Sequence, residues 1–370
     1  MADMLDYLAW RGDIEFTQMP VNPVDALIFS TLSYIDFKDI VPDNPMQSVS
    51  MKEAAAGFFS LSEPQNRTRV KKDLELLEAT ANSARFDNIR LSFYRSILIP
   101  EEDTQFAAVT IFLEDGSAYI AFRGTDNTLT GWKEDFNMTF QSSIPAQRLA
   151  LEYVQEFAAA HPIPIWMGGH SKGGNLAVYA AAKCGELLQK RIVEVHNQDG
   201  PGFSEVMMND PGYQAILPKL RSYVPQSSVI GMLLEHEETY TVVKSRHIGI
   251  FQHDPYTWEV LGGDFIRLEE VTAGSRITDR AVKSWVAGLS PQQRGQIVDS
   301  VFDLLSSNDI DYTEELRQPR NLLAVLRSLK DADKGTRRLL ADALGKLVRS
   351  TADALQEEAS PQREGSLTLR

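Results

Sequence analysis

A serine between two glycines constrains this chain more than any other feature. Residues 163–167 form a short apolar segment that predicts a buried strand, and it leads into Gly169-His170-Ser171-Lys172-Gly173. An alanine-rich segment, residues 174–188, follows and predicts a helix. The pattern G-x-S-x-G is weak alone, because chance produces it in roughly one of ten chains of this length. Between a strand and a helix, however, it predicts a sharp, strained turn with the serine at its tip.

Such a turn exposes the serine oxygen above a sheet, where a nucleophile meets its substrate. Side chains two residues before and after the serine would collide with the neighbouring strand and helix, which explains Gly169 and Gly173. The positive end of the helix dipole and the backbone N–H of Lys172 would face an oxyanion. We therefore predict that Ser171 is a nucleophile in a turn that includes His170.

Strands and helices alternate around this turn, which predicts an α/β fold with a mainly parallel sheet flanked by helices. Hairpin-type turn residues at 114–117 add an antiparallel edge. The predicted strands span residues 89–98, 105–113, 118–122, 163–167, 192–196, 220–224 and 239–243. The helix predicted at 145–160 lies between two of these strands, as in a βαβ unit.

Changes in this pattern divide the chain into four parts. We expect a mainly helical segment that packs on the core at 1–81, the α/β core at 82–259, a helical region at 260–358 and a flexible tail at 359–370. Strand signals stop at about Gly263, after which amphipathic helices are predicted. The charged residues of these helices favour solvated faces around a small core over a lid.

The composition limits the binding partners, the location and the cofactors that we expect. The net charge of −14 would repel phosphate backbones and anionic membranes, so nucleic acid is not an expected partner. No stretch approaches the roughly 20 apolar residues of a membrane-spanning helix, and the N-terminal residues lack a signal-peptide pattern, so we expect a cytoplasmic protein. Cys184 is the only cysteine, and His236-Glu237-Glu238-Thr239-Tyr240 lacks the second histidine of a zinc peptidase, so we expect no metal and no cofactor.

A second oxyanion donor is expected from an earlier loop. Residues 119–126 end the third predicted strand, and we assign Thr125 as the donor through its backbone N–H and its hydroxyl. A purely structural turn fixed by Gly124 fits the same spacing.

Three motifs together resemble the class 3 lipases, namely Phe122-Arg123-Gly124-Thr125, Trp132 with Asp135, and the glycine-rich segment 169–174. The whole chain is more similar to the bacterial Mbeg-like α/β-hydrolase family, including Tyr7-Leu8-Ala9-Trp10-Arg11-Gly12-Asp13 and Gln252-His253-Asp254-Pro255-Tyr256. The resemblance implies a hydrolase fold and a lipase-like oxyanion loop, and it supplies no substrate. Lys172 departs from the leucine that class 3 lipases usually carry, and its charge would favour an anionic substrate.

The general base should be a histidine after Ser171, since α/β-hydrolases place their triad in the order serine, acid, histidine. His196 lies inside a predicted strand, which indicates a core histidine. His236 and His247 flank the strand at 239–243 and stay open as alternatives. We predict His253, which follows that strand in a loop beside proline and aromatic residues.

The triad acid has three candidates. Asp199 follows the strand that comes after the helix predicted at 174–188, a placement that resembles the acid of pancreatic-type lipases. A purely structural Asp-Gly turn fits the same residues. In class 3 lipases the acid follows the next strand, where residues 224–229 hold no carboxylate. We prefer Asp199, with Glu235 and Asp254 as alternatives.

These residues predict a serine hydrolase of esterase or lipase type that cleaves a small-molecule or lipid carboxylic ester through an acyl-enzyme. Thioesterases and peptidases share this strand-serine-helix turn, so thioesters and amides stay open as alternative substrates. The alternative is a catalytically inactive hydrolase-fold protein that binds a partner through its C-terminal helices, because a carboxylate is missing near Ser228. The sequence identifies no protein partner.

Overall fold

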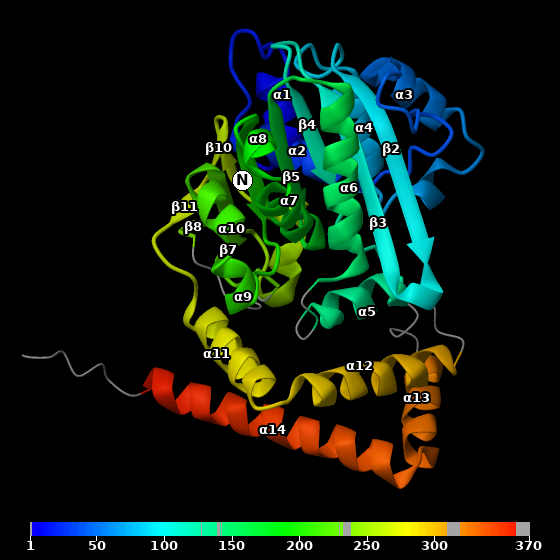
Figure 1. The fold of residues 1–370 in the computed structure, drawn as a ribbon, viewed down its shortest axis with the longest axis vertical. Coiled ribbons are helices and arrows are strands. Elements are labelled where there is room, and N and C mark those ends of the chain that lie inside the picture. The colour runs from blue at the N-terminus through cyan, green and yellow to red at the C-terminus, as the bar shows by residue number, and fades with distance from the viewer. Residues whose placement is uncertain are drawn as a thin grey trace, which may run out of the picture.

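The computed structural model describes residues 2–126, 128–138, 141, 143–228, 230–231, 238–308 and 319–359. Within them, a nine-stranded sheet has the order β1-β2-β3-β4-β5-β6-β7-β8-β11 (Figure 1). Its strands are β1 (Ser48–Ser50), β2 (Arg90–Ile99), β3 (Thr104–Phe112), β4 (Ala118–Phe122), β5 (Ile165–His170), β6 (Ile192–Gln198), β7 (Leu220–Pro225), β8 (Tyr240–Val243) and β11 (Arg267–Leu268). A separate pair consists of β9 (Val260–Leu261) and β10 (Asp264–Phe265).

The helices precede, interrupt and follow this sheet. Before β1 lie α1 (Met4–Arg11) and α2 (Pro23–Leu32), and between β1 and β2 lie α3 (Met51–Phe59) and α4 (Lys72–Ala81). Between β4 and β7 along the chain lie α5 (Leu129–Asn137), α6 (Pro145–Ala160), α7 (Lys172–Lys183), α8 (Glu186–Gln189), α9 (Glu205–Met208) and α10 (Pro211–Ile216). After β11 come α11 (Ala273–Ala287), α12 (Pro291–Ser306), α13 (Pro319–Asp331) and α14 (Lys334–Ala359).

The sheet is parallel from β4 to β8 and antiparallel at both edges, which confirms the α/β-hydrolase type of architecture. Two expectations were wrong in detail. The strand signals were expected to stop at Gly263, but β10 and β11 follow, because two-residue strands are too short to show alternation. The helix predicted at 174–188 divides into α7 and α8 at Gly185, whose φ of +89° interrupts a right-handed helix.

Both faces of the sheet are covered, as a parallel sheet requires. Alternation along β4 assigns Tyr119 and Ala121 to the core shared with the N-terminal helices, and Ile120 and Phe122 to the core shared with α6 and α7. In Figure 1, α6 and α7 lie on the near side of the sheet, and the blue N-terminal helices lie behind it. The N-terminal segment is therefore one of the two layers that bury the sheet.

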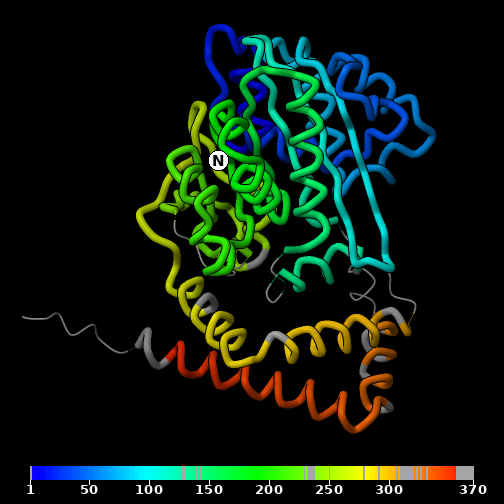
Figure 2. The backbone as a smooth tube through the Cα atoms, in the orientation of Figure 1, coloured from blue at the N-terminus to red at the C-terminus, as the bar shows by residue number. Residues whose placement is uncertain are grey.

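The C-terminal helices lie together outside these two layers. In Figures 1 and 2, α11 to α14 form a group beneath the sheet, with α12 below α5 and α14 running beneath α11 and α12. Small apolar clusters hold the group together, one of which combines Trp285, Leu289 and Ala343. No helix in the described part of the chain is both long and apolar enough to cross a membrane. The division of the chain at residues 81, 259 and 358 stays a prediction, and residues 360–370 of the expected tail lie outside the described residues.

Candidate active site

Ser171 lies at the tip of the turn between β5 and α7. Its φ of 59° and ψ of −135° place a non-glycine residue in a region that costs on the order of 1–3 kcal/mol. The Ser171 N–H donates to the carbonyl of Gln198 over 2.9 Å, which attaches the turn to the end of β6. A Cβ on Gly169 would lie 2.2 Å from the carbonyl carbon of Gly173, and one on Gly173 would lie 2.1 Å from the Phe122 carbonyl oxygen. Both glycines are therefore sterically required.

His253 and Asp199 meet beside this turn. His253 ends the short 3-10 helix Gly249–His253, and its Nδ1 donates to Asp199 Oδ2 over 2.6 Å. Asp199 is buried, whereas the His253 side chain is 25% exposed. With Nδ1 engaged as donor, the neutral imidazole has its lone pair on Nε2, which is the state a general base needs. Within the described residues, no hydrogen bond joins the Ser171 hydroxyl to this imidazole; this contact is often long in unliganded enzymes and shortens with substrate.

The other carboxylate oxygen of Asp199 is held by the loop after β7. Asp199 Oδ1 accepts from the Ser228 hydroxyl over 2.5 Å and from the Gly231 N–H over 3.1 Å. A Cβ on Gly231 would lie 2.2 Å from this oxygen, so glycine permits the approach. Ser228 therefore occupies the strand end that lacks a carboxylate, and its hydroxyl holds Asp199, which follows the neighbouring strand.

His170 fixes the backbone of the histidine loop. Its Nε2 donates to the His253 carbonyl over 2.7 Å, and its Nδ1 accepts from the Tyr34 hydroxyl at 3.0 Å. Burial lowers the pKa of His170 well below its usual value, so the ring is neutral with its proton on Nε2. The sequence placed His170 in the turn but gave no indication of Tyr34, which lies 136 residues earlier.

The loop with Thr125 lies against Ser171. A Cβ on Gly124 would lie 2.4 Å from the His170 carbonyl oxygen and 3.1 Å from Ser171 Cβ. The Thr125 hydroxyl donates to Asp135, which α5 supplies, so this hydroxyl proton is already engaged. Burial raises the pKa of Asp135 to about 6. In the described part of the chain, the backbone N–H groups of Thr125 and Lys172 have no hydrogen-bond partner.

The Lys172 side chain points away from this space. It is buried, and its Nζ donates to Glu134 Oε2 over 2.8 Å and to the carbonyl and side-chain oxygens of Gln105 over 2.9 and 2.8 Å. The expectation that its charge would favour an anionic substrate is therefore wrong, because the ammonium already has three acceptors inside the protein. Glu134 also accepts from the Ala146 N–H over 2.9 Å, and no sequence pattern indicates this role.

The alternative site residues lie elsewhere. His247 is exposed, and Asp254 accepts from the Tyr256 N–H and pairs with Arg69 at 3.5 Å. His196 is buried in β6, and burial lowers its pKa to about 3, in keeping with a core histidine. Glu235 and His236 lie outside the described residues. None of the described groups of histidine, cysteine and acidic side chains could hold a metal ion.

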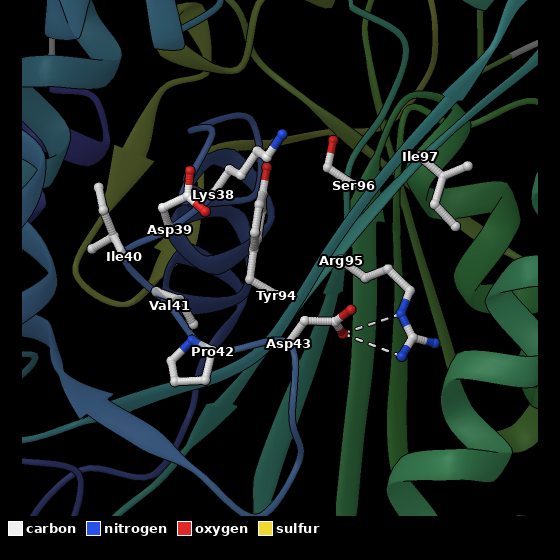
Figure 3. Close-up of a pocket in the computed structure, with 10 residues that line it drawn as sticks. All are labelled: Lys38, Asp39, Ile40, Val41, Pro42, Asp43, Tyr94, Arg95, Ser96 and Ile97. Atoms are coloured by element: carbon white, nitrogen blue, oxygen red, sulfur yellow. Dashed lines mark hydrogen bonds and ion pairs between the residues drawn. The ribbon is translucent and has the colours of Figure 1, made fainter.

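A small apolar pocket adjoins Ser171. Its volume is about 80 Å³. It is lined by Trp132, Asp135, Phe136, Met138, Ser171, Lys172, Pro201, Ile230, Val282 and Val286. A larger cavity of about 590 Å³ lies between residues 38–43 and β2, away from these residues (Figure 3). There Arg95 is already paired with Asp43 and with Glu156 over 2.9 Å, so that cavity is not a strong anion site.

Comparison with known proteins identifies a family. The model of the Mbeg1-like family matches residues 80–303. None of the curated proteins matches the sequence. Among solved structures, M37 lipase has a TM-score of 0.37 and 14% identity, with 57% of this chain and 68% of that chain covered. The lipase of Rhizomucor miehei in its propeptide complex has a TM-score of 0.36 and 15% identity, with coverage of 64% and 80%. Scores this low have no bearing on activity.

Proposed function

The chain belongs to the Mbeg1-like family, and from its site we propose that this member is a serine hydrolase that cleaves carboxylic esters of small molecules or lipids. One observation carries the proposal: a buried aspartate holds the imidazole of His253 at 2.6 Å beside a serine in a strained strand-to-helix turn. This arrangement provides the parts of a Ser-His-Asp triad. The family itself supplies no substrate.

In the proposed mechanism, Nε2 of His253 takes the proton of the Ser171 hydroxyl as its oxygen attacks the ester carbonyl carbon. The imidazolium remains bonded to Asp199, which stabilises its charge. His253 then gives the proton to the leaving alcohol oxygen, and the C–O bond breaks to leave an acyl-enzyme. Water, deprotonated by the same imidazole, then attacks the acyl carbon. The bond from that carbon to Ser171 Oγ breaks, the imidazolium returns the proton to this oxygen, and the acid leaves.

The tetrahedral intermediates need donors for their negative oxygen. The backbone N–H groups of Lys172 and Thr125 are the two candidates, because neither has a partner among the described residues and both adjoin the Ser171 turn. Loss of one such donor in other hydrolases costs about 3–4 kcal/mol of transition-state stabilisation. The bond from the Thr125 hydroxyl to Asp135 would orient this loop.

Intact-mass labelling with a fluorophosphonate tests the proposal. We expect one adduct on the wild type, none on Ser171→Ala, and labelling slowed by several orders of magnitude in His253→Ala. His247→Ala is the matched control, because this histidine is exposed, and it should label at the wild-type rate.

Absence of an adduct on folded wild-type protein, with and without a non-ionic detergent, would reject the proposal. A non-catalytic binding protein would then be the better description. The hydrogen bond from Ser228 to Asp199 argues against that description, because it removes the objection that the site lacks a supported acid.

A further inference from the structure

The pocket beside Ser171 is closed by a helix that follows the nucleophile by about 100 residues. Val282 and Val286 of α11 line the pocket together with Ser171. The two valines are four residues apart, so they lie on the same face of the helix, one turn apart. The C-terminal helices therefore form part of the candidate active site, although the charge of these helices favours solvated faces.

The position of the pocket indicates which part of an ester it receives. The leaving oxygen must lie near His253, which protonates it. The described residues that line the pocket include Ser171 and Lys172, and they do not include His253. On this lining the pocket belongs to the acyl group, whose carbonyl carbon bonds to Ser171, rather than to the leaving group beside His253.

The lining sets the chemistry of that acyl group. Seven of the lining residues are apolar: Trp132, Phe136, Met138, Pro201, Ile230, Val282 and Val286. The two charged residues of the lining lie beside each other: Asp135 Oδ1 is 3.9 Å from the Lys172 ammonium, which is also bound to Glu134, and Asp135 Oδ2 accepts from Thr125. A volume of about 80 Å³ is far below the roughly 300–1,000 Å³ of pockets that hold drug-sized ligands.

We propose that Val282 and Val286 are specificity-determining residues that close the acyl pocket and restrict the enzyme to esters of short, uncharged acyl groups. This inference rests on the proposed function, because it assumes that Ser171 is the nucleophile.

The first turn of α11 is attached to the loop that supports the triad acid. The Thr272 N–H donates to the Gln226 carbonyl over 2.6 Å, and the buried Ser275 hydroxyl donates to the Ser228 carbonyl over 2.7 Å. Ser228 in turn donates to Asp199. The wall of the pocket and the acid are thus held by the same short loop, which fixes the distance between them.

The far end of α11 and the opposite wall are held as well. Trp285 Nε1 donates to the Ala343 carbonyl of α14 over 2.9 Å. On the opposite wall, the ring of Phe136 in α5 lies 6.1 Å from that of Phe302 in α12. Both walls therefore rest on C-terminal helices, and we expect the pocket to keep its size rather than to widen for long chains.

Hydrolysis of p-nitrophenyl acetate, butyrate and octanoate tests the inference. In the double variant Val282→Ala/Val286→Ala, the ratio of kcat/KM for octanoate to that for butyrate should rise about tenfold or more, because the pocket gains the space of four methyl groups. In Val286→Phe, which fills the pocket instead, butyrate turnover should fall at least tenfold while acetate turnover changes less. Val301→Ala, at an exposed valine of α12, is the matched control. It should leave the octanoate-to-butyrate ratio and the butyrate-to-acetate ratio unchanged.

A second series holds the acyl group at butyrate and varies the alcohol. We expect the alanine double variant to leave the alcohol preference unchanged; a change there without a change in acyl preference would overturn the assignment. Unchanged acyl ratios in both pocket variants, with wild-type labelling by the fluorophosphonate, would overturn the inference and leave the proposed function intact. A wild type that neither reacts with the fluorophosphonate nor hydrolyses any ester would reject the proposed function and, with it, this inference.

Discussion

Two groups of helices flank the same α/β core, and they are attached to it in different ways. In the N-terminal group, every residue of α2 from Val24 to Leu32 is buried, and the apolar residues of that helix belong to the core cluster that also holds Tyr119 and Ala121 of β4. In the C-terminal group, the apolar clusters are small, and α14 exposes Leu344 and Val348. The first group is a layer of the fold, whereas the second packs against the end of the core that lies beneath the sheet in Figure 1.

The ion pairs of the two groups differ in the same way. Asp25 and Arg85 are both fully buried, and Arg85 also donates to the carbonyls of Ile14 and Met19. At the C-terminal group, Lys133 of α5 pairs with Asp299 of α12 at 3.2 Å, but the Asp299 side chain is 64% exposed. Substitutions in the first group should therefore cost stability, whereas those in the second should mainly change the pocket.

The largest expected effect comes from Arg85→Met. It leaves Asp25 buried without its cation, and removal of one partner of a buried pair typically costs about 3–5 kcal/mol. Urea unfolding measures this loss. Lys52→Met is the matched control, because Lys52 is 62% exposed in its pair with Asp87 and should contribute no more than about 1 kcal/mol. Equal losses in both variants would contradict the view that the buried pair anchors the N-terminal layer.

Asp135 lies on α5, between the core and the C-terminal helices, and its pKa gives the next effect. Burial raises this pKa from 3.8 to about 6, so the folded state holds the proton more tightly than the unfolded chain does. The free energy of unfolding should therefore fall as the pH rises from about 4 to about 6, by on the order of 3 kcal/mol for this group. Above that range the penalty is complete.

Asp135→Asn removes this titration. Urea unfolding at pH 4 and pH 7.5 should show the variant gaining stability relative to the wild type at the higher pH only, because asparagine carries no charge to bury. A difference between variant and wild type that is the same at both pH values would show that the pKa of Asp135 is not raised.

Tyr34→Phe tests whether the N-terminal layer also reaches the chemistry. Loss of the hydroxyl leaves the buried Nδ1 of His170 without its donor, which should cost about 1–1.5 kcal/mol. Because His170 holds the His253 carbonyl, fluorophosphonate labelling of Ser171 should also slow several-fold. Tyr94→Phe, which loses a hydrogen bond to Asp36 away from the site, should leave the labelling rate unchanged. Equal labelling rates in both variants would limit Tyr34 to a structural role.

The sequence predicted what short stretches of chain encode. The strand at 118–122 and the helix at 145–160 match β4 and α6 residue for residue, because apolar alternation or helical spacing continues over their whole length. The turn at Ser171 was predictable for the same reason, since its strand, glycines and helix are contiguous.

The supporting contacts were not predictable, because they join distant segments. Glu134 meets Lys172 across 38 residues, and Ser228 meets Asp199 across 29. No local periodicity marks such pairs. The valines of α11 were also hidden: among the charged residues of an amphipathic helix they indicate a helix face, and only the fold shows that this face lies over Ser171.

Asp299→Asn gives the smallest expected effect, and it tests directly whether the C-terminal helices contribute to stability. Lys133 keeps its pair with Asp103 at 3.1 Å, and an exposed pair contributes little, so the free energy of unfolding should change by less than about 0.5 kcal/mol. The octanoate-to-butyrate ratio should shift by less than about twofold, since Phe136 and Phe302 still hold α5 against α12. Urea unfolding and the ester series measure both quantities. A loss above about 2 kcal/mol would mean that the C-terminal helices are as integral to the fold as the N-terminal layer, and the separation of stability from selectivity between the two groups would not hold.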